Sequence, residues 1–166
     1  ASTTASNWTV GTLTNTSTGT LFSGGDLLVN AGTAPRGVTL TNEGVFQANK
    51  NLTLAFDTLV LPKGEEIGGA LSGAGTFNLG VTNALGLEGL LFSKQNLVAN
   101  FGNNLTIRPD GSVIALNDLS ITATGNTLAN YGFVYGGRHL TLAANNIGNF
   151  TAVSIDPTAT RLGVSG

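Results

Sequence analysis

Short apolar runs alternate with polar residues at a period of two along most of the chain. Examples are Leu52-Leu54, Leu105-Ile107 and Leu119-Ile121, and Gly, Asn, Thr and Ser separate such runs. A period of two predicts β-strands with one face turned inward. No stretch combines a period of 3.6 with capping signals at both ends, so the pattern predicts an all-β chain.

The strands recur at a fixed interval. Six glycine anchors are separated by 25, 25, 20, 22 and 21 residues: Gly19, Gly44, Gly69, Gly89, Gly111 and Gly132. Two residues after each anchor the side chain is apolar: Leu21, Phe46, Leu71, Leu91, Val113 and Val134. Four residues after each anchor it is small: Ser23, Ala48, Gly73, Ser93, Ala115 and Gly136. Eight residues after come Leu27, Leu52, Phe77, Leu97, Leu119 and Leu140, and ten after come Val29, Leu54, Leu79, Ala99, Ile121 and Leu142.

These columns predict one coil of a solenoid per unit. The anchor begins one inward-facing strand, the eighth and tenth positions belong to a second, and a third precedes the next anchor, as at Val38/Leu40, Leu85/Leu87, Leu105/Ile107 and Leu128. Coils stacked about 4.8 Å apart would form parallel sheets around a common interior. We therefore expect a right-handed parallel β-helix of about six to seven coils. A β-sandwich is the alternative, although its hairpins would not impose this common register.

We expect a single β-helical unit over residues 1–166. Residues 1–16 are predicted to form an N-terminal edge or cap. The charged, Pro-containing stretch around Leu61–Glu66 predicts an inserted loop over 57–68. Residues 151–166, interrupted by Asp156-Pro157, are expected to form a partial last coil or a tail.

Composition narrows the functional classes. Charged residues make up only 10% of the chain, hydrophobic residues 41%, and the formal net charge is −2. Seven dispersed cations give no basic stripe for nucleic acid. The absence of Cys excludes disulfides and thiolate metal sites. We expect no cofactor and no metal.

Two units carry a family resemblance. The stretches beginning Leu40-Thr-Asn-Glu-Gly and Leu128-Ala-Asn-Tyr-Gly resemble filamentous-haemagglutinin-type repeats. Two residues before the anchor, Asn stands at Asn42 and Asn130, and the other four units have Ser17, Ile67, Leu87 and Pro109. Such repeats build the shafts of large Gram-negative exoproteins exported by two-partner secretion, among them adhesins and effectors of contact-dependent growth inhibition.

The resemblance implies a structural and adhesive role at the bacterial cell surface or in the secreted fraction. The segment would be a rigid spacer that presents a distal binding or toxin region. Its partners would be the neighbouring coils of the full-length exoprotein, an outer-membrane transporter during secretion and a receptor on a host or target cell. Two alternatives are a receptor-binding module and a carbohydrate-active β-helix enzyme.

Candidate catalytic groups are few. The corner position seven residues after the anchor holds Asp26, Asn51, Thr76, Asn96, Asp118 and His139. Its two aspartates would be about 19 Å apart, whereas glycosidase carboxylates lie roughly 5–9.5 Å apart. Asp118 and His139 would touch on adjacent coils, which predicts a surface contact without a nucleophile. We therefore expect no catalytic residue and no enzyme activity.

The outward positions give the candidate site. Positions one and three residues after the anchor would face the surface, and in the last three units they are largely apolar. Together with Tyr131 they define the apolar stripe: Leu90, Phe92, Ile114, Tyr131, Phe133 and Tyr135. Exposed patches of this kind mark interaction sites or lie under another part of the protein. We expect either a covering segment or a partner-binding surface.

Overall fold

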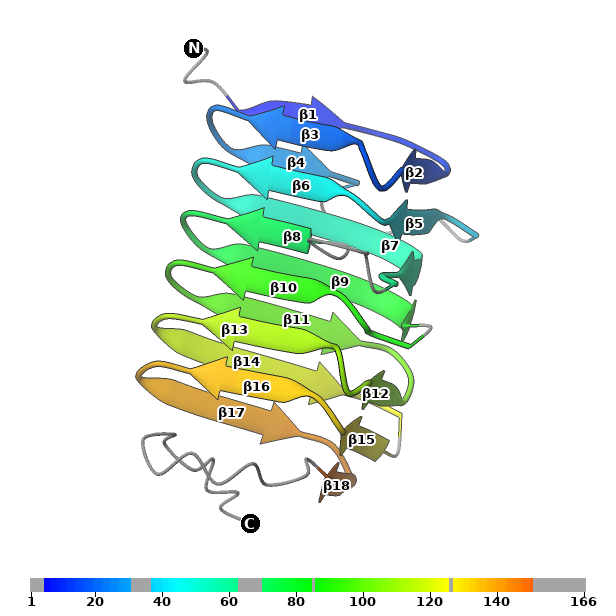
Figure 1. Cartoon of the computed structure of the whole chain (residues 1–166), viewed down its shortest axis with the longest axis vertical. Helices are drawn as coiled ribbons and strands as arrows, with labels where there is room; N and C mark the ends of the chain where they lie inside the picture. Colours follow the sequence, from blue (N-terminus) through cyan, green and yellow to red (C-terminus); the bar gives the residue numbers. More distant parts are fainter. Residues whose placement is uncertain (1–4, 31–36, 63–69, 85, 126, 151–166) are drawn as a thin grey trace.

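Parallel strands wind the chain into a stack of coils in the computed structural model (Figure 1). The structure describes residues 5–30, 37–62, 70–84, 86–125 and 127–150. Within these ranges every regular element is a strand and every strand pair is parallel. The predicted parallel β-helix is therefore confirmed, and the hairpins of a β-sandwich are absent from the described part of the chain.

The first wall of the solenoid is a six-stranded sheet, to which each of six successive coils contributes one strand. Its strands begin one residue after each predicted anchor. They are β3 (Thr20–Ser23), β6 (Val45–Ala48), β8 (Ala70–Gly73), β10 (Leu90–Ser93), β13 (Ser112–Ala115) and β16 (Phe133–Gly136).

The second wall stacks seven strands, one from each coil and one from the N-terminal edge. They are β1 (Ser6–Trp8), β4 (Leu27–Val29), β7 (Leu52–Val60), β9 (Phe77–Ala84), β11 (Leu97–Phe101), β14 (Asp118–Ala123) and β17 (His139–Ala143). The third wall contains β2 (Leu13–Asn15), β5 (Thr39–Asn42), β12 (Leu105–Ile107), β15 (Thr127–Asn130) and β18 (Asn146–Asn149). Both β2 and β5 belong to the same hydrogen-bonded sheet as the second wall, because β7 continues around the corner.

The four predicted columns coincide with the observed register. Leu91 pairs with Leu71 and Val113, two residues after their anchors, and Ser93 pairs with Gly73 and Ala115. The eighth and tenth positions stack in the same way, as when Leu97 and Ala99 pair with Leu119 and Ile121. In the inward columns of both walls, residues of like type therefore lie on one another.

The interior is apolar and closed along most of the stack. Phe46, Phe56, Phe77 and Phe101 are among its largest fully buried side chains. Trp8 packs edge-on against Phe46 near the N-terminal end, with ring centroids 6.2 Å apart. One coil cannot bury its apolar face alone, so each relies on the coils above and below it.

On the third wall, the observed strand pairing differs from the predicted alignment of asparagines. Asn15 pairs with Asn42, and Ile107 pairs with Asn130, in place of Ser17 and Pro109. Counting back from the anchors fails here because the number of residues between this strand and the next anchor varies among coils. The buried Asn42 accepts a hydrogen bond from Asn15 Nδ2 at 2.8 Å and donates one to the Gly44 carbonyl at 2.9 Å. A ladder of satisfied amides thus replaces apolar packing at this position.

The predicted inserted loop over 57–68 begins too early. Residues 57–60 lie in β7, where Thr58 and Leu59 pair with β5 on one side and β9 on the other. Backbone pairing on both sides and burial of Leu59 hold this stretch in the wall. Residues 63–68 lie outside the described residues, as do Leu85, residues 1–4 and the predicted partial coil or tail at 151–166. Within 5–16, β1 and β2 pair with β4 and β5 as an incomplete edge coil.

The anchor glycines allow close stacking of the coils. Val45 N–H donates to the Gly19 carbonyl at 3.0 Å, and Phe133 N–H donates to the Gly111 carbonyl at 2.9 Å. The carbonyl of one anchor therefore lies directly over the next anchor. A Cβ added at Gly44 would collide with the carbonyl oxygens of Gly19 and Thr16. These contacts involve backbone atoms, which cannot rotate away.

We predict that Gly44→Ala lowers the free energy of unfolding by roughly 2–3 kcal/mol, because adjacent coils must separate to admit a methyl group. Gly80→Ala is the matched control, since the nearest atom to its added Cβ is the Leu54 carbonyl oxygen at 4.0 Å. That variant should be neutral or up to about 1 kcal/mol more stable. Urea unfolding followed by circular dichroism measures both, and equal stability of the two variants would contradict the stacking role of Gly44.

Candidate functional site

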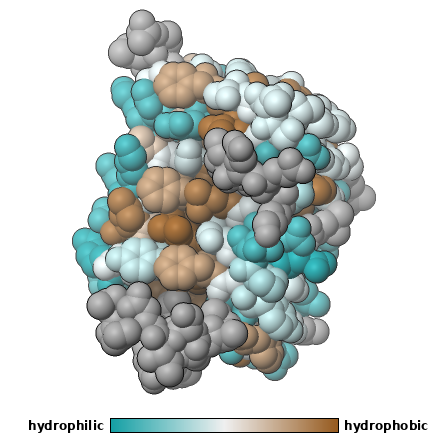
Figure 2. Space-filling view, viewed as in Figure 1, coloured by the Kyte–Doolittle hydropathy of each residue, from teal (hydrophilic) through white to brown (hydrophobic). Residues whose placement is uncertain are grey.

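The apolar stripe lies on the first wall, near the C-terminal end of the solenoid. Phe92 pairs with Ile114, which pairs with Tyr135, and Leu90 reaches Phe133 through Ser112 in the same way. The alternation of each strand turns these side chains outward while their neighbours enter the core. Figure 2 shows hydrophobic residues gathered over this part of the face.

Exposure increases along the stripe towards the C-terminal end. Leu90, Phe92 and Ile114 are half-buried, whereas Phe133 and Tyr135 are 52% and 39% exposed. The rings of Phe133 and Tyr135 are nearly parallel, with centroids 6.3 Å apart and 7° between their planes. The most accessible part of the stripe is therefore this aromatic pair on β16.

Tyr131 stands apart from that pair. Its ring stacks on Phe150 at a centroid distance of 4.9 Å, and the two side chains are 42% and 57% exposed. The predicted stripe thus divides into a main column on β10, β13 and β16 and a separate aromatic pair at the end of the third wall.

Three further exposed apolar side chains lie outside the predicted stripe. Phe22, 56% exposed, belongs to the same column as Phe92, with Gln47 and Ser72 between them. Applying the third position after the anchor to the first unit would have found it. Leu116 and Phe150 lie beyond the ends of β13 and β18, where the repeat pattern gives no orientation.

The predicted contact between Asp118 and His139 is present on the second wall. Asp118 pairs with His139 in the ladder, and the Asp118 Oδ1 atom lies 2.8 Å from His139 Nδ1. Arg138, which the sequence did not indicate, donates from Nε to the same oxygen at 2.9 Å and from Nη2 to Oδ2. We call these three residues the Asp118 cluster.

The Asp118 cluster is an exposed ion-pair network. Hydrogen bonds from Arg138 and then His139 hold the pKa of Asp118 well below its usual range, and Asp118 raises the pKa of Arg138. Ser120 and Thr141 line the same shallow hollow as Asp118 and His139. Within the described residues neither hydroxyl is hydrogen-bonded to His139.

Three other corner residues of this column bind backbone through their side chains. Asp26 Oδ1 accepts the Asn51 N–H at 2.9 Å, and Asn51 Oδ1 accepts the Thr76 N–H at 2.9 Å. Asn96 Oδ1 accepts the Asp118 N–H at 3.3 Å. Each side chain therefore caps the next coil at the corner between the first and second walls.

Groups of metal-ligating side chains are absent from the residues that the structure describes. The same ranges contain no helix long and apolar enough to span a membrane. Comparison of the chain with known protein families, with curated proteins and with solved structures finds no match. The resemblance to filamentous-haemagglutinin-type repeats stays a prediction.

We predict that Asp118→Asn lowers stability at pH 7, because the amide has no negative charge and only one acceptor oxygen for Arg138 and His139. A carboxylate whose pKa is depressed in the folded state stabilises that state at any pH above its unfolded pKa, which is near 4. This contribution is lost progressively as the pH falls below that value. The difference between the two proteins should therefore shrink below about pH 4, and also at high salt because the cluster is exposed.

Thermal unfolding between pH 2 and pH 7 measures this difference. Glu43→Gln is the control, since it removes an exposed carboxylate in another part of the solenoid. A difference that persisted unchanged at pH 2 would show that Asp118 does not act through its charge.

Proposed function

We propose that this segment is a non-catalytic, rigid β-helical spacer in a large secreted or surface-bound bacterial exoprotein. The observation that carries the proposal is the unbroken register of the first and second walls. Every coil is hydrogen-bonded to the next, and each adds about 4.8 Å along one axis. Such a stack resists bending and sets a fixed distance between the segments at its two ends.

The exterior supports the same role. Uncharged Asn, Thr and Ser occupy much of the surface, and the corner side chains of Asp26, Asn51 and Asn96 cap backbone instead of converging on a ligand. The sequence contains no Cys, so the chain could cross an oxidising periplasm without forming disulfides. The resemblance of the Leu40 and Leu128 units to filamentous-haemagglutinin-type repeats supports the assignment to an exported shaft.

Surface exposure tests the location. We expect an antibody raised against residues 5–150 to label intact cells of the producing bacterium or to detect the segment in the medium. Protease added to intact cells should remove the cell-bound signal, and a cytoplasmic protein serves as the control. A segment found only in the cytoplasm would overturn the proposal.

The spacer role makes a separate prediction about length and stiffness. Removal of one coil, residues 89–110, should leave the distal region active. It should shorten the distance between the segments at the two ends of the spacer by about 4.8 Å. Replacement of residues 19–150 by a Gly/Ser linker with the same number of residues should impair that activity, because the linker is a flexible coil. Full activity of the linker protein would contradict a mechanical role.

The second candidate function is receptor binding through the apolar stripe. Exposure of the Phe133–Tyr135 pair favours it, because aromatic residues dominate the energetics of many protein interfaces. The receptor would be a protein on a host or target cell, and the first wall would present the aromatic column to it.

For this candidate we predict that Phe92→Ser combined with Tyr135→Ser weakens cell binding at least about 30-fold, as expected when two interface anchors are lost. Phe22→Ser is the matched control, because Phe22 lies in the same column three coils away. Binding of fluorescent protein to cells gives the readout, and circular dichroism checks folding. Intact binding by the folded double variant would exclude the stripe as the contact surface.

A further inference from the structure

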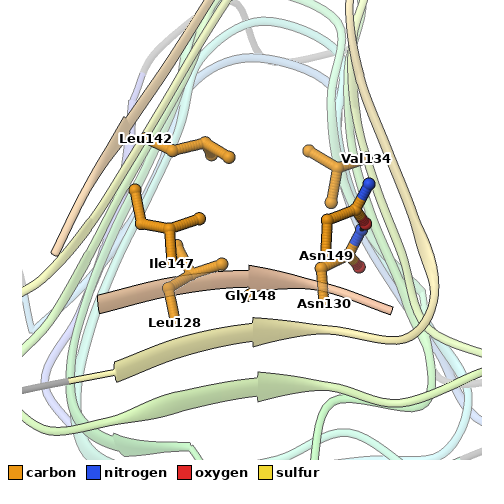
Figure 3. Close-up of a pocket in the computed structure, with 7 residues that line it drawn as sticks. All are labelled: Leu128, Asn130, Val134, Leu142, Ile147, Gly148 and Asn149. Atoms are coloured by element: carbon orange, nitrogen blue, oxygen red, sulfur yellow. The ribbon is translucent and has the colours of Figure 1, made fainter. Parts of the chain in front are cut away.

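The outer face of the first wall is uncharged over all six coils. Its strands β3, β6, β8, β10, β13 and β16 contain no Asp, Glu, Lys or Arg. Figure 3 shows Val134 of β16 pointing into the interior, towards Leu142 on the opposite wall. Its neighbours Phe133 and Tyr135 therefore point outwards, and both are exposed. Depletion of charge together with exposed aromatic rings is typical of the core of a protein interface.

Charged residues flank this face, and the two signs lie on opposite edges. Glu43 and Glu88 each directly precede an anchor glycine, at the edge next to the third wall. Lys50 and Lys94 follow the same two strands, β6 and β10, at the corner with the second wall. Backbone bonds to the preceding coil hold all four in place: the N–H groups of Glu43, Lys50, Glu88 and Lys94 donate at 2.8, 3.3, 3.0 and 3.1 Å. The second and fourth coils thus each carry a fixed acidic edge and a fixed basic edge.

Three of these four side chains are available to a partner. Glu43, Lys50 and Lys94 are exposed and form no ion pair with any described residue. Glu88 is half-buried, and its Oε1 atom lies 3.3 Å from Arg108 Nε. The strongest pairing that a partner could form therefore involves Glu43 and Lys50 of the second coil.

A second copy of the chain matches this arrangement of charge. When two first walls pack face to face about a two-fold axis parallel to the solenoid, both copies point in the same direction and each coil faces the same coil of the other copy. The acidic edge of each copy then lies over the basic edge of the other. Glu43 of one copy meets Lys50 of the second, and Glu88 meets Lys94. Each contact occurs twice, as a two-fold interface requires.

The dimensions of the face suit a dimer of moderate affinity. Sheets packed face to face lie about 10 Å apart, a gap that an extended Lys and an extended Glu side chain bridge together. Six strands of about seven residues, counted from the acidic to the basic edge, cover about 600 Å² per copy. Two such faces bury about 1,200 Å², the lower end of the range for specific interfaces.

The opposite orientation of the second copy is disfavoured by charge. A two-fold axis parallel to the strands would reverse one solenoid against the other and bring like edges together. Glu43 in the second coil would then face Asp110, which precedes β13 in the fifth coil. Like charges placed together across an interface disfavour the complex, so the rim selects the parallel arrangement.

We propose that the first wall binds the first wall of a second copy of this chain, with both solenoids parallel and the main column of the apolar stripe at the centre of the interface. The buried aromatic residues supply most of the affinity, and the charged rim sets orientation and register. Neither end of the solenoid takes part, so the arrangement holds for a solenoid of any length. The proposal is independent of the spacer function, and it covers the surface that receptor binding would use.

Sedimentation velocity of the purified 166-residue chain over a concentration series tests this association without any receptor. We expect a monomer–dimer equilibrium with a dissociation constant of roughly micromolar order. Phe92→Ser should raise that constant at least about 10-fold, because an aromatic anchor is lost from the centre of the interface. Val98→Ser is the matched control and should leave the dimer unchanged, because Val98 is an outward residue of the same coil on the second wall.

Circular dichroism establishes that both variants are folded. A chain that stays monomeric up to millimolar concentration would overturn the proposal, and so would a dimer that tolerates Phe92→Ser.

Charge reversal at low ionic strength tests the orientation. Glu43→Lys and Lys50→Glu should each weaken the homodimer about 10-fold, because two pairs of like charge then meet at the rim. In an equimolar mixture, heterodimers of the two variants should form about as tightly as the original dimer, since both rim pairs again have opposite charge. An affinity tag on one variant isolates the heterodimer. A mixture that fails to recover would overturn the proposed arrangement, and so would tighter association of Glu43→Lys, which the reversed orientation requires.

Discussion

The parallel hydrogen-bonded ladder between successive coils is the constraint on which the rest of this structure depends. A coil of 20 to 25 residues cannot enclose its own apolar side chains, so its stability comes from the coil on either side. Pairing in register places each inward residue over its counterpart, for example Leu97 over Phe77 and under Leu119. The anchor glycines follow from the same constraint, because the carbonyl of one coil occupies the space that a side chain would need in the next.

Stacking also governs the exterior. A residue type repeated on adjacent coils meets itself at about 4.8 Å, so like charges would repel and amides can form ladders. Asn15 with Asn42 and Asn130 with Asn149 use this proximity inside the third wall, and Asp26 and Asn51 use it at a corner. Where charges do meet, in the Asp118 cluster, a carboxylate lies between two basic side chains. The apolar stripe departs from this polar surface and is therefore the strongest candidate for a contact surface.

Much of the fold could be predicted from sequence, because the ten residues after each anchor contain no insertion. Spacing alone therefore placed all four inward columns of the first two walls. The third wall was less predictable: three residues separate Asn15 from Gly19 but only one separates Asn42 from Gly44, so strand pairing decided the register. The strand at residues 57–60 was missed because the loop predicted from the charged, Pro-containing stretch 61–66 was extended into the preceding residues. Arg138 was missed because its contact depends on side-chain reach between coils.

A distance measurement along the second wall tests the stacked rod most directly. The chain has no Cys, so cysteines introduced at Leu28 and Thr141 would carry the only two spin labels. These positions occupy one outward column, five coil steps apart. Electron–electron double resonance should give one narrow distribution centred near roughly 24 Å, five times the spacing of about 4.8 Å between strands. A broad distribution, or a main distance well beyond that value, would contradict a rigid stack in register.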